Sequence, residues 1–171
     1  MANFYKDSSN NRYYINKAYT YNSKYYGRAL ANASMFSALG FTLVNVATKP
    51  NERFYNVTGP DINGAWATID KNLADLKTQL KRETKFESFR LLKETDWYSL
   101  RKHDAGTAIP SDITTYRTGI RTVATSRCNA IDAAATVSAL ETLITIEVGQ
   151  SGGLDAFPTL SNAANYYLSP Y

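Results

Sequence analysis

Cysteine and histidine are nearly absent from this sequence, and their scarcity excludes several kinds of functional site. The chain has one residue of each kind among its 171 residues. The single cysteine, Cys128, cannot form a disulfide within the chain, and we expect it to pack as a small hydrophobic side chain in a helix. Zinc sites use more Cys and His ligands than this chain has, and the acidic residues lack the spacing of a calcium-binding loop. We therefore expect no metal or other cofactor.

Recognisable catalytic motifs are missing as well. The sequence contains no glycine-rich phosphate loop, no dinucleotide-binding fingerprint and no serine or cysteine nucleophile in a known motif. His103 stands beside Asp104, but neighbours on a short connector need not face each other, and a catalytic pair needs that geometry. These absences favour a protein that is not an enzyme.

The chain also has no long apolar run and no strong charge of one sign. No basic and apolar leader opens it and no segment has the length of a membrane span, so we expect a soluble protein without a membrane partner. The formal net charge is +4, and bases alternate with acids in runs such as KRETKFE. Arg117, Arg121 and Arg127 could share one side of a helix and meet phosphates, but a solvated face is favoured, and no nucleic-acid partner is expected.

Tyrosine, by contrast, is abundant, with thirteen residues against seven Phe and two Trp. Its ring is apolar and its hydroxyl polar, which suits surfaces that become interfaces. Between residues 12 and 27, aromatic runs separated by turn-forming Asn pairs predict two or three short antiparallel strands. These strands either cover their own core with aromatic side chains or present tyrosines to a partner. The candidate interface residues here are Tyr14, Tyr19, Tyr21, Tyr25 and Tyr26.

The rest of the first sixty residues completes a small unit. Residues 1–10 have the composition of a frayed terminus. A short helix is predicted over 32–39, capped by Asn32 or Ser34 and ended by Gly40. Two more strands are predicted over 41–46 and 53–58, around the turn KPNE. We therefore expect residues 1–60 to form a Tyr-rich β-sheet unit with one short helix.

A long helix is expected to open at Asn63 or Gly64. It would carry apolar residues at spacings of three and four, which is typical of a helix packed on another helix. These residues are Trp66, Ile69, Leu73, Leu76 and Leu80. The pattern is interrupted by KRETK and resumes with Phe86 and Phe89, which predicts a phase shift between Lys81 and Lys85. The partner is either a later helix of the same chain or, in an oligomeric bundle, other subunits.

Further helices are predicted up to residue 148. Thr95 is expected to cap a short helix that Gly106 ends, and Ser111 or Asp112 to cap the long helix that follows. Gly119 within that helix would permit close helix approach. A separate helix is expected to restart with Thr136 as its cap. Residues 61–148 should therefore form a helical hairpin or bundle.

The last part of the chain, residues 149–171, is expected to be a Gly linker and an extended C-terminal arm. The arm is too apolar to stay in water alone, so it should dock on its own domain or, as we favour, on a neighbouring subunit. Its candidate interface residues are Phe157, Tyr166, Tyr167 and Tyr171. The predicted fold class is thus α+β, with a small Tyr-rich antiparallel sheet unit, a helical hairpin or bundle, and the arm.

One segment resembles a known family. The strings Leu91-Leu92, Thr95-Asp96-Trp97, Ile109-Pro110, Tyr116-Arg117 and Ile120-Arg121 resemble a segment of the small tail proteins of tailed bacteriophages, a group that includes tail fibre assembly chaperones. The resemblance runs from Arg90 to about Leu140 and implies shared architecture without a catalytic residue. The motif-like residues are expected to fix the hairpin more than to contact a partner. They are Thr95, Asp96, Trp97, Ile109, Pro110, Tyr116, Arg117 and Arg121.

The resemblance implies a structural role in a phage particle. We expect a virion component of the tail, baseplate or fibre-attachment region, assembled in the host cytoplasm and acting through protein-protein interfaces. Its partners would be other phage tail proteins, in a homo- or hetero-oligomer. Two alternatives stay open, a tail fibre assembly chaperone that is not part of the virion and a receptor- or glycan-binding module.

Overall fold

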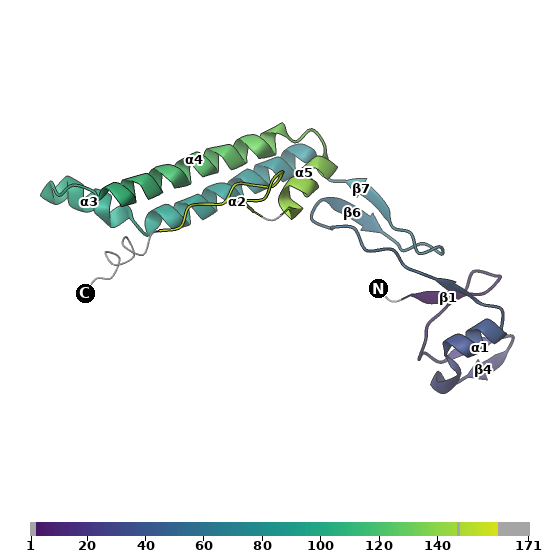
Figure 1. Cartoon of the computed structure of the whole chain (residues 1–171). Coiled ribbons are helices and arrows are strands. Elements are labelled where there is room, and N and C mark those ends of the chain that lie inside the picture. The colour runs from purple at the N-terminus through teal and green to yellow at the C-terminus, as the bar shows by residue number, and fades with distance from the viewer. Residues whose placement is uncertain (1–2, 147, 161–171) are drawn as a thin grey trace. The chain divides into compact units, whose positions relative to one another are not determined.

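The computed structural model describes residues 3–146 and 148–160, and these residues have an α+β fold, as the sequence predicts. The chain divides into two compact units, Met1–Asp70 and Lys71–Tyr171 (Figure 1). The division falls later than the boundary at residue 60 that the sequence suggested. Residues 149–160 belong to the second unit and do not form a separate part.

A three-stranded antiparallel sheet opens the first unit, in the order β2-β1-β5. Its strands are β1 (Phe4–Lys6), β2 (Arg12–Tyr13) and β5 (Thr42–Val44). The prediction of a frayed N-terminus is therefore wrong for β1, which lies at the centre of this sheet and contributes the buried Phe4. Its polar neighbours form the turn to β2, because Asp7 accepts hydrogen bonds from the backbone N–H groups of Ser9 and Asn11.

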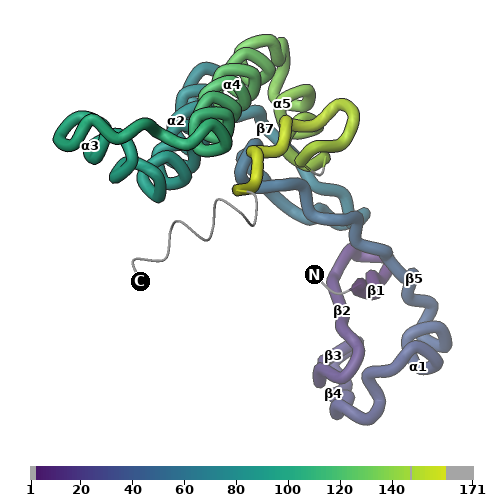
Figure 2. The backbone as a smooth tube through the Cα atoms, turned by 60° about the vertical axis from the view of Figure 1, so that its left-hand side comes forward, coloured from purple at the N-terminus to yellow at the C-terminus, as the bar shows by residue number. Residues whose placement is uncertain are grey.

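The aromatic segment forms a hairpin, as predicted. β3 (Tyr19–Tyr21) pairs antiparallel with β4 (Lys24–Tyr26), and Asn22 and Ser23 make the turn at positive φ. The chain then passes through η1 (Arg28–Leu30) and α1 (Ala33–Ala38) to β5, a path that Figure 2 follows. The predicted cap of α1 is confirmed, because the Asn32 side chain accepts from the N–H of Met35. Gly40 follows this helix with a φ of 75°.

Two strands and a turn replace the predicted start of the long helix. β6 (Tyr55–Thr58) pairs antiparallel with β7 (Ala67–Asp70), while β5 pairs with β1. The two strands predicted on either side of KPNE are therefore present, but they do not pair with each other. The prediction that the long helix begins at Asn63 or Gly64 is wrong, because α2 begins at Leu73. Asp61 folds the intervening turn by accepting from the N–H groups of Asn63 and Ala65. Trp66 and Ile69 thus belong to the hairpin segment and not to a helical stripe.

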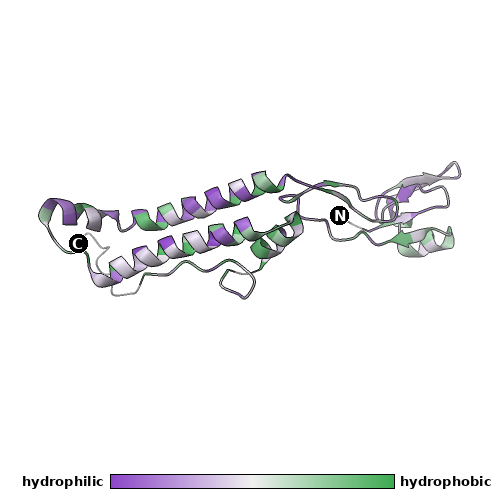
Figure 3. Cartoon of the chain, turned by 90° about the horizontal axis from the view of Figure 1, so that it is seen from above, coloured by the Kyte–Doolittle hydropathy of each residue, from purple (hydrophilic) through white to green (hydrophobic). Residues whose placement is uncertain are grey.

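The second unit is built on two long helices. α2 (Leu73–Lys93) begins where the Asn72 side chain accepts from two backbone N–H groups, and α4 (Ser111–Ala133) packs beside it (Figure 1). Hydrophobic and hydrophilic residues alternate along both helices in Figure 3, which is typical of helices that bury one side. The packing partner of α2 is thus a later helix of the same chain. The buried residues are Leu76, Leu80 and Thr84 of α2 and Ile113, Tyr116, Ile120, Arg127 and Ile131 of α4.

The predicted phase shift in this helix is wrong. Thr84 continues the buried stripe four residues after Leu80, and Phe86 and Phe89 are 69% and 59% exposed. The buried side of the helix thus keeps its phase, with the small polar side chain of Thr84 buried in it. One turn further on, Glu87 lies toward α4 and accepts a hydrogen bond from Arg127.

Shorter helices flank the pair, namely α3 (Asp96–Ala105) between α2 and α4, and α5 (Val137–Thr145) after α4. Gly106 ends α3 with a φ of 69°, and the Thr136 side chain caps α5 by accepting from the N–H of Ala139, so both predictions are confirmed. Thr95 is the N-cap residue of α3 as predicted, but its side chain makes no capping hydrogen bond, and the cap predicted for α4 is wrong. The Thr95 hydroxyl donates to the carbonyl of Leu92, and α4 has Pro110 at its N-cap position, ahead of Ser111 and Asp112.

The glycine-rich segment is a closed turn and not a linker. The N–H of Gly149 donates to the carbonyl of Leu154 at 2.7 Å, and Gly149 and Gly152 have φ values of 87° and 85°. Residues 154–160, which we call the strap, follow this turn. At Gly119 a Cβ atom would lie 3.1 Å from Cγ of Pro158, so this glycine admits the strap and not, as predicted, another helix. The described part of the arm therefore docks on its own unit.

Candidate functional site

Three of the motif-like residues meet in one polar cluster, which we call the hairpin clamp. Arg117 of α4 donates from Nη1 to the carbonyl of Leu92 at 3.0 Å and to Oγ1 of Thr95 at 2.7 Å. Its Nη2 donates to Oδ1 of Asp96 at 2.9 Å. Thr95 is fully buried. The clamp therefore ties the turn between α2 and α3 to α4 through hydrogen bonds that a charged donor strengthens.

Apolar packing supports the hairpin clamp from α3. The Trp97 ring stacks on Tyr98 with centroids 3.9 Å apart, and the Arg101 guanidinium lies 4.9 Å from the Trp97 centroid. Tyr98 and Ile113 form a buried cluster, and Ile109 of the motif and Leu160 of the strap pack against it. These contacts fix the position of α3 on the hairpin.

The remaining motif-like residues have different positions. Pro110 is the N-cap of α4, and Tyr116 is buried between the helices. Burial raises the pKa of the Tyr116 phenol, with a smaller contribution from Glu94, so this phenol is neutral at physiological pH. Arg121 is not part of the hairpin clamp. It is exposed, and its Nη1 donates only to the carbonyl of Arg117 at 3.4 Å.

A second arginine holds the strap, and the interpretation of this residue as part of a solvated face is wrong. Arg127 is 5% exposed, donates from Nη1 to Oε2 of Glu87 at 2.8 Å and from Nε to the carbonyl of Asp155 at 2.6 Å. Its guanidinium lies 4.1 Å from the ring centroid of Phe157. The hydroxyl of Ser126 also bonds the carboxylate of Asp155. Arg127 thus joins α4, α2 and the strap, a role with no local sequence signal.

The candidate interface aromatics fall into three groups. Tyr26 is buried and stacks on Tyr19 with centroids 4.8 Å apart, and Tyr19 and Tyr21 pack against the aromatic core of the first unit. Those three side chains cover their own core. Tyr14 and Phe157 are half-buried, the latter beneath Arg127, and Tyr25 is 71% exposed. Tyr25 is therefore the interface candidate that stands furthest into solvent; Tyr166, Tyr167 and Tyr171 lie outside the described residues.

Two neighbouring titratable groups of the first unit, Asp7 and Tyr13, have pKa values that differ from their usual ones. Burial alone would raise the pKa of Asp7, but hydrogen bonds from Asn11, Tyr13 and Ser9 outweigh it and hold that pKa below its usual value. Burial, the hydrogen bond to Asp7 and the Asp7 charge raise the pKa of Tyr13 to about 12. Both groups therefore keep one protonation state near neutral pH, which suits a turn that is held by charge and hydrogen bonds.

The residues that could suggest catalysis or metal binding are dispersed. His103 Nδ1 lies 3.1 Å from Oδ1 of Asp104, but the two side chains are 87% and 64% exposed on α3. Within residues 3–146 and 148–160, no group of three His, Cys, Asp or Glu side chains is placed to hold a metal ion. None of the helices described in this structure combines the length and apolarity needed to cross a membrane.

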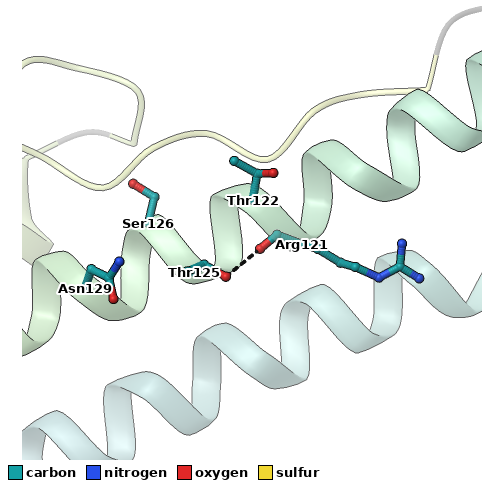
Figure 4. A pocket seen from close by; sticks show the side chains of 5 residues that line it. All are labelled: Arg121, Thr122, Thr125, Ser126 and Asn129. Atoms are coloured by element: carbon teal, nitrogen blue, oxygen red, sulfur yellow. Dashed lines mark hydrogen bonds between the residues drawn. The ribbon is translucent and has the colours of Figure 1, made fainter.

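A shallow polar hollow lies along the outer side of α4 (Figure 4). Its lining comes from one helix and comprises Arg121, Thr122, Thr125, Ser126 and Asn129. Thr125 donates its hydroxyl to the carbonyl of Arg121, and Ser126 is held by Asp155, so two of the hydroxyls already have partners. The described residues of this hollow do not supply the convergent polar groups of a binding pocket.

Among the described residues of the second unit, the most exposed aromatic surface lies on α2, and the sequence pattern did not indicate it as a surface. Six exposed residues share the side of this helix that faces away from α4, and we call them the basic aromatic face. They are Arg82, Lys85, Phe86, Phe89, Arg90 and Lys93.

Comparison with protein-family models, with curated proteins and with solved structures finds no match to this chain.

Proposed function

We propose that this chain is a structural component of a bacteriophage virion, in the tail, baseplate or fibre-attachment region, and that it acts through protein-protein interfaces. One observation carries the proposal. Thr95, Asp96 and Arg117, which bear the resemblance to small phage tail proteins, meet in the hairpin clamp and have an architectural role there. The resemblance implies such a role, so the geometry supports the proposal.

Exposed apolar side chains add support. Phe86 and Phe89 lie three residues apart on one side of α2 and are 69% and 59% exposed. Large apolar groups that gather on a surface are typical of sites that another protein covers. A subunit of a particle would cover them with other tail proteins, either copies of this chain or different chains.

The proposal is tested by quantitative mass spectrometry of phage particles purified on a density gradient. A structural component is present at a fixed copy number relative to the other tail proteins, and that ratio stays constant through a second gradient. If the chain is abundant in the lysate but is lost on purification, the proposal is wrong and a tail fibre assembly chaperone takes its place.

A receptor- or glycan-binding module would give a different result. Replacement of the exposed Tyr25 by Ala would then abolish adsorption to the host while particle yield and the copy number of this chain stay unchanged. A structural subunit with Tyr25 at an interface would instead lose particle yield.

A further inference from the structure

The basic aromatic face has a composition that differs from the rest of its helix. Successive residues of an α-helix are about 100° apart, so its six members fall within an arc of roughly 140° on the side opposite Leu76, Leu80 and Thr84. Four members are Lys or Arg, two are Phe, and all six are exposed. The first and last members are Arg82 and Lys93, so the face extends over three turns of α2.

The acids of this segment lie elsewhere on the helix. Glu87 points to the α4 side, where Arg127 bonds it at 2.8 Å. Glu83 is exposed beside the edge of the face, and Gln79 donates a hydrogen bond to its carboxylate at 3.1 Å. The charges that alternate in the sequence KRETKFE are thus sorted by the helix into sides, and the face itself carries four positive charges and no negative one.

The two phenylalanines are the apolar centre of the face. They are 69% and 59% exposed, so no described residue covers most of either ring. Their spacing of three places them on adjacent turns, where they form a short ridge. Such a ridge packs well into the groove between the side chains of a second helix.

We propose that the basic aromatic face docks an acidic amphipathic helix of another protein, whose apolar side chains pack on Phe86 and Phe89 and whose carboxylates meet the four surrounding cations. Helix-in-groove recognition uses apolar anchors at such spacings, and charges on the rim select the partner. The inference deepens the proposed function, and it rests on that function only in expecting the partner among other tail proteins.

Charge argues against a second copy of this chain as the occupant. If two α2 helices pair antiparallel with Phe86 against Phe89, Arg82 lies against Lys93 and Lys85 against Arg90. If they pair parallel and in register, each cation meets its own equivalent. Both arrangements oppose like charges without an acid between them, which costs free energy and selects against the wrong partner.

The test uses the purified full chain and two designed helical peptides with the same leucine stripe, one flanked by Glu and one by Lys. Fluorescence anisotropy of the labelled peptides measures affinity. We expect the Glu peptide to bind and the Lys peptide not to bind. We expect the Phe86→Ala/Phe89→Ala chain to bind the Glu peptide roughly tenfold more weakly or worse. The matched control is Leu100→Ala, an equally exposed apolar residue on α3, which should leave the affinity unchanged.

A charge swap tests the electrostatic part. The double substitution Arg82→Glu/Lys93→Glu should lower the affinity for the Glu peptide and give measurable binding of the Lys peptide. Since all these positions are exposed, the variants should keep the circular dichroism of the unaltered chain, which is checked first. The inference is overturned if both peptides bind equally, or if the two Phe substitutions leave the affinity for the Glu peptide unchanged.

Other occupants have their own signatures in the same set of variants. Binding to phosphatidylserine vesicles or to duplex DNA that depends on Phe86 and Phe89, without binding of the Glu peptide, overturns the inference in favour of a membrane or a nucleic acid. Self-association that the Phe substitutions remove overturns it in favour of a second copy. The proposed function is tested separately, because peptide binding by a chain that is missing from purified particles contradicts that function alone.

Discussion

Arg117 on α4 donates a hydrogen bond from Nη1 to Oγ1 of Thr95 at 2.7 Å, across 22 residues of sequence. The same Thr95 hydroxyl donates to the carbonyl of Leu92 and makes no capping hydrogen bond to α3, although Thr95 is the N-cap residue of that helix. A residue of the second long helix thereby fixes the turn that ends the first. This fixed turn orients α2 and, with it, the basic aromatic face.

Replacing Arg117 by Ala should destabilise the second unit by about 1.5–3 kcal/mol, because the substitution removes the charged donor to the buried Thr95 hydroxyl and to the Leu92 carbonyl, although that carbonyl keeps its hydrogen bonds from Thr95. The ion pair between Arg117 and Asp96 contributes little to this loss of stability, since the Asp96 carboxylate is largely exposed. The measurement is urea unfolding followed by helical circular dichroism. Arg121→Ala is the matched control, four residues along the same helix, and should change stability by less than about 0.5 kcal/mol. Equal losses in both variants would contradict the hairpin clamp.

Replacing Arg127 by Met should release the strap, since Met keeps the apolar length but loses the bonds to Glu87 and to the Asp155 carbonyl. Cleavage within residues 154–160 by a protease of broad specificity should then speed up by at least about tenfold, while cleavage in the middle of α2 changes little. Ser126→Ala removes a neighbouring bond to Asp155 from a less buried position and should have the smaller effect. A strap that stays protected without Arg127 would show that Phe157 and Pro158 hold it by packing alone.

Gly119 should accept Ala but not Leu. A Cβ atom there meets Cγ of Pro158 at 3.1 Å, a contact that a small shift of the strap relieves, and Ala gains up to about 1 kcal/mol of helix propensity over Gly. A Leu side chain needs the space of the strap and should expose Phe157. Limited proteolysis after residue 150 measures the release. The control is Thr118→Leu, at the exposed neighbouring position. Cleavage that is as fast in this control as in Gly119→Leu would contradict the close approach of Gly119 to Pro158.

Stability of the first unit should fall in acid because of Asp7. Its folded pKa lies below the unfolded value of about 3.9, so its carboxylate stabilises the fold above that pH, and the contribution is lost as the pH falls through the lower folded value. Asp7→Asn should therefore be less stable at neutral pH and lose less on acidification. Chemical unfolding of the two chains at a series of pH values, followed by near-UV circular dichroism, measures the difference. An acid dependence that is the same in both chains would contradict this role of Asp7.

Structure that depends on local chemistry could be predicted from the sequence. Asn32, Gly106 and Thr136 end or begin helices as expected, since a cap needs only its own side chain and the next turn of backbone. Thr95 is the N-cap residue of α3 as expected, but its hydroxyl accepts from Arg117 and donates to Leu92 and makes no capping hydrogen bond. Ile69 fits both a helical stripe and an alternating strand, and only the turn built on Asp61 shows that it belongs to β7.

The candidate surfaces were harder to predict than the fold. Tyr19 and Tyr26 look like an exposed pair in a strand pattern, yet they stack on each other over an aromatic core that α1 completes. Phe86 and Phe89 look like a resumed core stripe, yet they lie outside because Thr84 keeps the buried side in phase. Sequence spacing gives the side of a helix on which a residue lies, but only the packed partner decides which side is buried.

The central claim, a virion component that binds its neighbours through a helical surface, is tested most directly by site-specific photo-crosslinking in purified particles. Benzoylphenylalanine replaces Phe89, with Ser99 on α3 as the matched exposed position, and cross-linked products are identified by mass spectrometry. We predict that position 89 cross-links to a different tail protein, through a helix with acidic residues beside apolar ones, and that the yield exceeds that of position 99. Particles that lack the chain, or a position 89 that gives no cross-linked neighbour, would contradict the account.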